Sequence, residues 1–491
     1  MRTYNKQYTH QQYVENICSN LTRWLRRKSR KISQELKEAA LILTKIHLDS
    51  VEPYLESLYS PNPRGRTPYN PVCMLRSLLL MTLLRYTSIE KWAAELEKKP
   101  RLAVLCGFAS HSGERVKTPA ASTFYLFIDW LEDGEYHKPC EHYTRPSQLR
   151  KKKHLRNIKN EEQQRKAGKK EDLTQYDSLT KKLKDDLIKD EDEPRPDDLL
   201  KRLEDILIKC AIIPSARRGL LGDTDSLIIS GDGSPLVTGA SHNGKPACEC
   251  RENGIYDCDC SRYYTDANAD WGYDSYRDCY YFGHTYYQHI ASISGHDLPL
   301  HVSITRASES DFTQSMKDFD RMRKTFREHG LEWLIDKTVY DSGHDSVGNY
   351  QYLMEQGITP VIALNPRTGV SPVPTGSAKE VNEEGIPICP GGRLMRRHSY
   401  NREKHRIIYT CPVKRLTRRD GKYMYVPHLD ECPLGCLCSP HTTMGPVVYV
   451  RTNDDPRLYP PIGRDSPQHK KLMKLRSGFI IFHSVSFLAK S

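Results

Sequence analysis

The stretch Ser226-Leu-Ile-Ile-Ser-Gly-Asp-Gly-Ser234 indicates how the C-terminal half of this chain folds. Its apolar run, Leu227 to Ile229, predicts a buried strand, and the glycines beside Asp232 allow backbone or ligand to approach closely where the run ends. No basic residue adjoins Asp232 in the sequence. We therefore expect its carboxylate to hold a metal ion, because hard oxygen ligands suit divalent cations.

The same pattern returns in Trp333-Leu-Ile-Asp-Lys-Thr-Val-Tyr-Asp-Ser-Gly-His-Asp345, where a second predicted strand leads into Asp341. Two aspartates at the ends of neighbouring strands supply half of a two-metal phosphoryl-transfer site. In such a site, cations about 4 Å apart clamp the attacking and leaving oxygens of an in-line displacement. We expect Asp232 and Asp341 to be catalytic residues that bind Mg²⁺ or Mn²⁺.

The segments around these aspartates predict an α/β fold with a ribonuclease-H-like mixed sheet. The Asp232 strand is followed by strands over 280–292 and 298–305, joined by a turn at Gly295-His-Asp297. A helix over 311–329 follows, with Met316, Phe319, Met322 and Phe326 on one face, then the Asp341 strand, a helix over 347–356 and a strand over 359–364. In this arrangement the first and fourth strands are adjacent, which would bring the two aspartates together.

The chain divides into three predicted parts. Residues 1–135 read as an all-α domain for DNA binding or dimerisation, in which Pro71 and Ser88 begin helices. Its short helices are compatible with helix-turn-helix docking on DNA, and equally with a helical bundle or dimer interface. Residues 136–215 form a charged helical connector, and 222–491 the catalytic domain, with insertions at about 241–265 and 366–444.

Composition is compatible with a polyanionic partner. Among 491 residues, 74 Lys and Arg exceed 62 Asp and Glu, which gives a net charge of +12, although solubility alone can explain a modest excess. The first 20 residues are polar and the longest apolar runs are too short to span a bilayer. We therefore expect a soluble, intracellular, cytoplasmic protein whose cysteines are free thiols or metal ligands.

Two groups of cysteines interrupt the predicted catalytic domain. The first comprises Cys248, Cys250, Cys258 and Cys260, and the second Cys389, Cys411, Cys432, Cys436 and Cys438. Four thiolates can close a structural Zn²⁺ site, although paired zinc ligands usually have two residues between them and the first group has one. Zinc at the first group and unliganded surface thiols both remain open. The second group is spaced more loosely, yet a segment this poor in apolar residues needs some staple.

Several blocks of the sequence resemble the DDE transposases of bacterial insertion sequences. Pro68-Tyr-Asn-Pro71, the apolar helix around 78–84 and Pro119-Ala-Ala-Ser-Thr-Phe124 resemble their N-terminal helical domain. The blocks that resemble their catalytic domain are Ser230-Gly-Asp-Gly-Ser234, Asp270-Trp-Gly-Tyr-Asp-Ser-Tyr-Arg277, Tyr281-Phe-Gly-His-Thr-Tyr286, Leu298-Pro-Leu300, Arg306-Ala-Ser308 and Tyr340-Asp-Ser-Gly-His-Asp345. The order and spacing of these blocks, which span about three quarters of the chain, carry the resemblance.

The resemblance implies that the protein binds terminal inverted repeats, cuts the DNA ends with water and joins them to target DNA, assembled on DNA as a homodimer or larger. Asp232 and Asp341 match the family's first two carboxylates, whose cations activate the attacking water. Phosphates could be gripped by Arg64, Arg66, Arg262, Arg277 and Arg306, although surface charge explains these residues equally well. Trp271 could stack on an extruded base, whereas burial is the commoner fate of a tryptophan.

The third carboxylate of the family, a Glu on a C-terminal helix, has no counterpart here. It should lie near Gly478, but the sequence from Phe479 to Ser491 is apolar and no acidic residue follows Asp465. We expect a frameshift or early stop to have replaced the catalytic helix and to have impaired strand cleavage; translation of the downstream nucleotides in other frames tests this. Glu309, Asp311, Asp345 and Glu355 are candidate substitutes, each more simply explained as a helix cap or an exposed charge.

Three function classes follow. The first is a DDE transposase impaired in this form, and the second is a DNA-binding remnant without chemistry that competes with intact enzyme. The third is a different metal-dependent nuclease, against which the long helical N-terminal region argues. Salt-dependent, sequence-specific DNA binding without metal-dependent cutting would distinguish the second class from the first.

Overall fold

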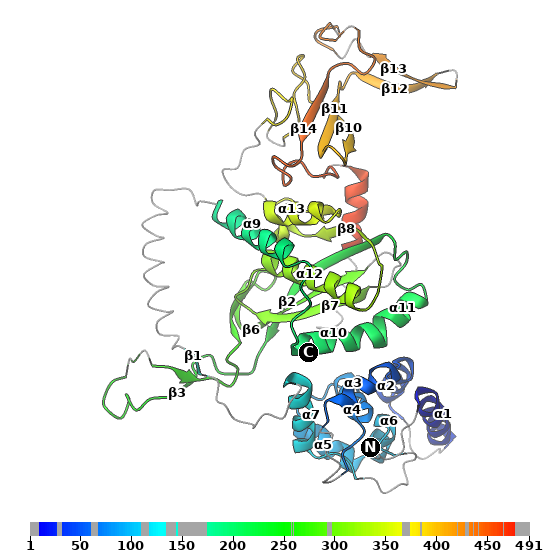
Figure 1. Cartoon of the computed structure of the whole chain (residues 1–491), viewed down its shortest axis with the longest axis vertical. Coiled ribbons are helices and arrows are strands. Elements are labelled where there is room, and N and C mark those ends of the chain that lie inside the picture. Colours follow the sequence, from blue (N-terminus) through cyan, green and yellow to red (C-terminus); the bar gives the residue numbers. More distant parts are fainter. Residues whose placement is uncertain are drawn as a thin grey trace. The chain divides into compact units, whose positions relative to one another are not determined.

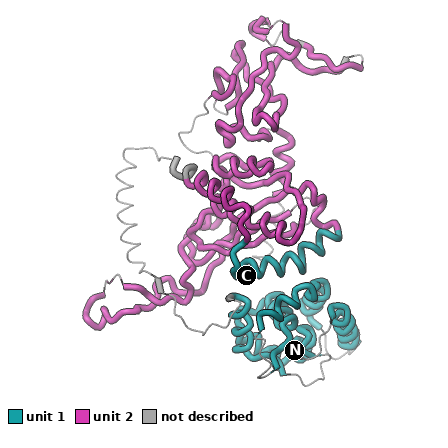
Figure 2. The backbone as a smooth tube through the Cα atoms, in the orientation of Figure 1, with its two compact units in different colours: residues 1–141, 195–218 teal, residues 142–194, 219–491 magenta. Residues whose placement is uncertain are grey.

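A computed structural model describes most of the chain, and the structural statements below concern its described residues. These are 9–26, 32–59, 67–109, 117–133, 144–145, 174–256, 258, 260–291, 297–365, 374–382, 385–419, 421–427, 432–435, 437–439, 441–464 and 466–476. The chain forms two compact units, residues 1–141 with 195–218, and residues 142–194 with 219–491 (Figure 2). The predicted connector at 136–215 is thus distributed between the two.

The first unit is helical, as its sequence predicts. Its elements are α1 (His10–Arg26), α2 (Gln34–Lys45), η1 (Asp49–Val51), α3 (Glu52–Ser57), α4 (Pro71–Leu83), α5 (Ile89–Lys98), α6 (Pro100–Cys106), α7 (Ala121–Asp133), α10 (Leu199–Leu207), η2 (Ile208–Ile212) and α11 (Ile213–Arg217). Pro71 opens α4, and the Ser88 side chain accepts a hydrogen bond from the Lys91 amide at the start of α5, so both predicted helix starts are confirmed. Trp24, Trp92, Phe124 and Phe127 are buried in its core.

A six-stranded mixed sheet forms the centre of the second unit (Figure 1). Its strands are β2 (Leu227–Val237), β5 (Asp270–Asp274), β6 (Cys279–Ala291), β7 (Leu298–Arg306), β8 (Ile335–Tyr340) and β9 (Thr359–Ile362). The order is β7-β6-β2-β8-β9, and β5 pairs with the first residues of β6. β2, β8 and β9 run parallel to one another, and β6 is antiparallel to both β2 and β7. The predicted adjacency of the first and fourth core strands, β2 and β8, is confirmed.

Helices cover this sheet. α12 (Asp311–Glu328) connects β7 to β8, and α13 (Val347–Glu355) connects β8 to β9. The predicted apolar face of α12, from Met316 to Phe326, is fully buried and packs on the sheet. α9 (Thr174–Lys189) contacts both helices. A helix at 467–476 packs Leu472 against Val339 and Val361, which fixes that helix beside the end of β8.

Both predicted insertions contain further strands. Around the first cysteine group, β1 (Thr144–Arg145), β3 (Lys245–Pro246) and β4 (Arg262–Tyr263) form a small antiparallel sheet. The second insertion holds a sheet of β10 (Arg396–Asn401), β11 (Arg406–Thr410) and β14 (Val447–Arg451), and a hairpin of β12 (Lys414–Arg419) and β13 (Lys422–Pro427). No helix among the described residues combines the length and apolar character needed to cross a bilayer.

Candidate active site

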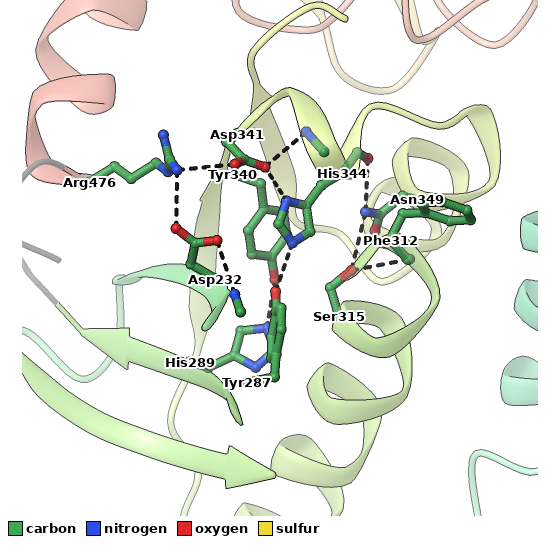
Figure 3. A network of polar contacts seen from close by, with 12 residues as sticks. Asp232, Tyr287, His289, Phe312, Ser315, Tyr340, Asp341, His344, Asn349 and Arg476 are labelled. Carbon is green, nitrogen blue, oxygen red and sulfur yellow. Dashed lines mark hydrogen bonds and ion pairs between the residues drawn. The ribbon is translucent and has the colours of Figure 1, made fainter. Parts of the chain in front are cut away.

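Asp232 and Asp341 lie together where two parallel strands part. Ser230 of β2 is paired with Val339 of β8, so each aspartate lies two residues beyond a paired position. Asp341 follows the last residue of β8, whereas β2 continues past Asp232 along β6. The strand pairing therefore brings the two predicted catalytic carboxylates to one place, as Figure 3 shows.

The side chain of Arg476 lies between these carboxylates. Its Nη2 atom is 3.2 Å from Asp232 Oδ2 and 3.1 Å from Asp341 Oδ2 (Figure 3). Arg476 belongs to the 467–476 helix, which begins where the Ser466 hydroxyl accepts a hydrogen bond from the His469 amide. A single cationic atom within hydrogen-bond distance of both aspartates shows that one oxygen of each points to a common position.

His344 fixes the orientation of Asp341. The His344 Nδ1 atom is 2.6 Å from Asp341 Oδ1, and its Nε2 atom is 2.9 Å from the Tyr287 hydroxyl. Burial lowers the pKa of His344, but the hydrogen bond and charge of Asp341 outweigh that effect and raise it. Burial raises the pKa of Asp341, but the hydrogen bond and charge of His344, together with the charge of Arg476, lower that pKa to about 2. Asp341 is therefore an ionised carboxylate with a fixed orientation at neutral pH.

Asp232 is packed more tightly than Asp341. Burial first, and then the charge of Asp341, raise the pKa of Asp232. A Cβ atom on Gly231 would lie 2.6 Å from the Tyr287 hydroxyl oxygen, and one on Gly233 would lie 2.6 Å from Asp311 Oδ1. The glycines that the sequence places beside Asp232 are thus required by close approach of neighbouring side chains.

Asp311 is a third carboxylate close to this pair. It begins α12, and burial, together with the charges of Asp232 and Asp341, raises its pKa against the lowering effect of His344. The other candidate substitutes are engaged elsewhere. Asp345 accepts from Arg457 Nε at 2.7 Å, Glu309 pairs with Lys317, and Glu355 pairs with Lys184. Of the four, Asp311 is the one whose pKa is raised by the charges of Asp232 and Asp341.

The arginines predicted to bind DNA lie outside this site or outside the described residues. Arg64 and Arg66 lie outside the described residues, and so do Cys436, Asp465 and residues 477–491. Arg262 donates to the Asn243 carbonyl, Arg306 donates to the Asn268 side chain, and Arg277 pairs with Asp274. The structure does not bring these three side chains to the two aspartates.

The first cysteine group converges on a site that could hold a metal. Its four sulfurs, from Cys248, Cys250, Cys258 and Cys260, all lie within 4.8 Å of one another. Two S···S distances are 3.6 Å, close to the separation of about 3.8 Å expected around a tetrahedral Zn²⁺ with Zn–S bonds of about 2.3 Å. A backbone hydrogen bond from Cys250, together with neighbouring thiols, lowers the pKa of the Cys248 thiol to about 7, whereas hydrogen bonds with Cys248 and Cys260 raise the pKa of the Cys250 thiol to about 12.

Sequence reasoning missed the roles of Arg476, His344 and Tyr287 at this site. His344 lies within the quoted block Tyr340 to Asp345, so its spacing of three residues from Asp341 was a usable signal. Arg476 and Tyr287 gave no such signal, because their approach depends on how distant elements pack.

The comparisons with known proteins support the resemblance. The model of a family described as transposase domain (DUF772) matches residues 28–130, which hold α2 to α6 and most of α7. Residues 28–130 thus match a transposase domain, and this match in the helical unit supports the predicted recognition as an insertion-sequence transposase. Searches of curated proteins and of solved structures found no match.

Proposed function

We propose that this chain, an insertion-sequence transposase by its helical domain, acts on DNA by DDE-type phosphoryl transfer at Asp232 and Asp341. The observation that carries the proposal is the convergence of these two carboxylates on one cationic atom at the end of a parallel strand pair. In this proposal residues 1–135 hold the element ends and 222–491 perform the chemistry, in an assembly of two or more copies at the bacterial nucleoid.

The topology of the sheet supports a ribonuclease-H-like catalytic domain. In the sheet, β6 lies between β2 and β7 and is antiparallel to both. The chain then crosses through α12 to β8, which is parallel to β2, and through α13 to β9, which is parallel to β8. The resulting order β7-β6-β2-β8-β9 places the strands of Asp232 and Asp341 side by side, as that fold requires.

The donor set fits Mg²⁺ or Mn²⁺. Carboxylate oxygens are the ligands that these hard cations prefer, and the fixed position of the Arg476 guanidinium indicates where a positive charge is stabilised. Bound there, a divalent cation would lower the pKa of water and neutralise charge on the reacting phosphate.

The protein's own groups prepare that site. The Nδ1–H group of His344 donates a hydrogen bond to Asp341 Oδ1. This bond orients the carboxylate so that Oδ2 is directed at the common position. Asp311 supplies a third carboxylate beside these two, and we propose it as the third acidic residue of the site. A divalent cation would bind the carboxylates in place of the Arg476 guanidinium.

The β5–β6 hairpin offers a surface for DNA. Trp271 is 40% exposed, not buried as most tryptophans are, and Tyr276 and Tyr280 are 95% and 74% exposed beside Arg277. Exposed aromatic rings that lie next to a guanidinium can stack on unpaired bases while the charge binds phosphate. The net charge of +12 is also compatible with a nucleic-acid partner.

We also propose Zn²⁺ at the first cysteine group. The four sulfurs have separations that suit a tetrahedral thiolate site, and the strands around them, β3 and β4, are two residues each. A metal would stabilise a segment that has too little apolar surface for a core of its own.

A second candidate function is DNA binding without cleavage. It is favoured by Arg476, whose guanidinium lies where a cation would be needed and pairs with both carboxylates. In that case the chain would occupy element ends and compete with intact transposase.

The test uses the full chain and a supercoiled plasmid that carries the element's inverted repeats. Salt-dependent binding to the repeats, with Mg²⁺- or Mn²⁺-dependent nicking that Asp232→Asn and Asp341→Asn each abolish, would support the catalytic proposal. Binding without nicking would support the second candidate. Neither binding nor nicking would refute both.

A further inference from the structure

A second set of four cysteines, distinct from the Cys248 group, comes together in the β10–β14 segment. Its described members are Cys389, Cys411, Cys432 and Cys438, which we call the second cysteine cluster. One precedes the β10–β11 hairpin, one follows β11 directly, and two lie in the loop before β14. None of the four forms a disulfide in the structure.

Two members of the cluster lie on turns that touch each other. The Cys389 turn is closed by Gly392, whose amide donates to the Cys389 carbonyl at 2.8 Å, and the Cys432 turn is closed in the same way by Gly435 at 3.0 Å. A Cβ atom on Gly391 would lie 3.7 Å from Cys389 Sγ and 3.7 Å from Pro433 Cδ. The thiols of Cys389 and Cys432 are therefore presented by neighbouring turns.

The other two members are joined through Lys414. Its ammonium donates to the carbonyl oxygens of Ser439 and Thr442, at 3.2 and 2.7 Å, which holds the loop after Cys438 over the end of β11. A Cβ atom on Gly445 would lie 3.4 Å from Cys411 Sγ. The loop that contains Cys438 thus covers the buried Cys411.

Consecutive turns link the two pairs. The turn that Gly435 closes after Cys432 is followed by a second one, in which the Leu437 amide donates to the Leu434 carbonyl at 2.9 Å, and this second turn leads directly into Cys438. One connected set of turns therefore carries Cys432 beside Cys389 and Cys438 beside Cys411. A bound divalent cation would stabilise all four thiolates together.

The sequence prepares the turns for this arrangement. Cys389, Cys411 and Cys432 are each followed directly by proline, and glycine stands three residues after Cys389 and Cys432. Proline after the first residue of a turn fixes its φ, and glycine at the fourth position is favoured in type I turns. The thiols are therefore carried on short turns whose backbone is largely fixed before any metal binds.

The segment also needs stabilisation that its apolar residues do not provide. Its buried core consists of Met395, Ile407, Tyr409, Val450 and Tyr459. A core of this size does not usually hold a loop-rich segment, and natural small domains add disulfides or a metal. Four soft thiolates in a tetrahedral arrangement select Zn²⁺.

We propose that the second cysteine cluster is a structural zinc site that holds the β10–β14 segment together. Its sulfurs are spread more widely than those of the Cys248 group, which all lie within 4.8 Å of one another. This site is independent of the chemistry at Asp232 and Asp341.

The first experiment counts zinc in the purified full chain by elemental analysis. The Cys389→Ser/Cys432→Ser variant is expected to lose one zinc per chain relative to wild type. The matched Cys248→Ser/Cys250→Ser variant changes only the other group. The variant with all four substitutions should lose as much zinc as the two double variants lose together. An unchanged zinc content in the Cys389→Ser/Cys432→Ser variant would overturn the proposal.

The second experiment uses the wild-type chain, so that it does not depend on a variant that folds. Alkylation of each cysteine is measured by peptide mapping before and after zinc removal with a chelator. Cys389, Cys432 and Cys438 should react at least tenfold faster after chelation. The exposed Cys18 should react at the same rate before and after chelation. Equal rates before and after chelation, or recovery of a disulfide among the cluster cysteines, would contradict a zinc site.

Discussion

Asp232 and Asp341 are two acids of the same type that differ in their surroundings. His344 donates a hydrogen bond to Asp341 and holds its pKa at about 2, while burial and the charge of Asp341 raise the pKa of Asp232. In the free protein the Arg476 guanidinium offsets part of this repulsion through one atom that contacts both. In our proposal, Arg476 and a divalent cation compete for the same two oxygens.

That competition gives a prediction for Arg476→Ala. Removal of the guanidinium should raise the affinity of the chain for Mn²⁺ about tenfold, the equivalent of roughly 1.4 kcal/mol. Arg476→Lys retains the charge and should have a smaller effect. Isothermal titration calorimetry measures both, and unchanged Mn²⁺ affinity in Arg476→Ala would show that the guanidinium does not occupy the cation's position.

A second residue-scale prediction concerns Gly231. A methyl group there would lie 2.6 Å from the Tyr287 hydroxyl oxygen and 2.9 Å from Tyr340 Cε1, so Gly231→Ala should destabilise the second unit by about 1–3 kcal/mol. Gly239→Ala is the matched control, because nothing lies within 4 Å of its new Cβ. Equal midpoints of urea unfolding for the two variants would show that the space around Gly231 can relax.

Among the elements, those with strong periodicity could be predicted and those set by distant packing could not. The apolar face of α12 and the pairing of β2 with β8 followed from the spacing of apolar residues and from the repeat of an apolar run before each aspartate. The short β5 and α6 were not predicted, because β5 exposes its aromatic residues and buries aspartate and glycine, and α6 begins at Pro100, which was expected only to end the helix before it. Proline is instead tolerated at its first turn.

The candidate site, like the fold, could be predicted only in part from the sequence. Both carboxylates were predicted at the ends of strands, and this is right for Asp341 but wrong for Asp232, because β2 continues to Val237 along β6. The two meet because the pairing of β2 with β8 stops at Ser230 and Val339. Arg476 was not foreseen, because its position depends on Leu472 packing against Val339, which lies far away in the sequence. Asp311 was named as a candidate substitute, but its proximity to Asp232 depends on where α12 begins relative to β2.

Strand β6 carries a buried histidine that should make the second unit sensitive to acid. Burial, and then the charge of His301, lower the pKa of His289 from 6.5 to about 3, and its Nε2 atom is 2.8 Å from the Tyr340 hydroxyl. Below pH 6.5 the unfolded chain binds a proton here that the folded chain does not bind until about pH 3. The stabilisation is therefore complete above pH 6.5 and is lost as pH falls, by about 2 kcal/mol at pH 5.

The measurement is amide hydrogen exchange in β6 between pH 7 and 5, corrected for intrinsic exchange rates. His289→Gln should remove most of the pH dependence, while the exposed His398→Gln should leave it unchanged. The same pH dependence in wild type and His289→Gln would assign the effect to other groups.

At the scale of the whole molecule, the chain has a helical unit with a transposase match and a second unit that carries two acids and two sets of cysteines. The helical domain is linked by its match to transposition, while the chemistry is inferred from the geometry of the second unit. The central claim is therefore that Asp232 and Asp341 together bind a divalent cation.

Mn²⁺ binding to the full chain tests this claim most directly, by calorimetry in the Arg476→Ala background, where the competing charge is absent. Asp232→Asn and Asp341→Asn should each weaken Mn²⁺ binding at least tenfold, whereas Asp454→Asn, at an exposed position after β14, should leave it unchanged. Retention of full Mn²⁺ affinity when both Asp232 and Asp341 are replaced by asparagine would contradict the account.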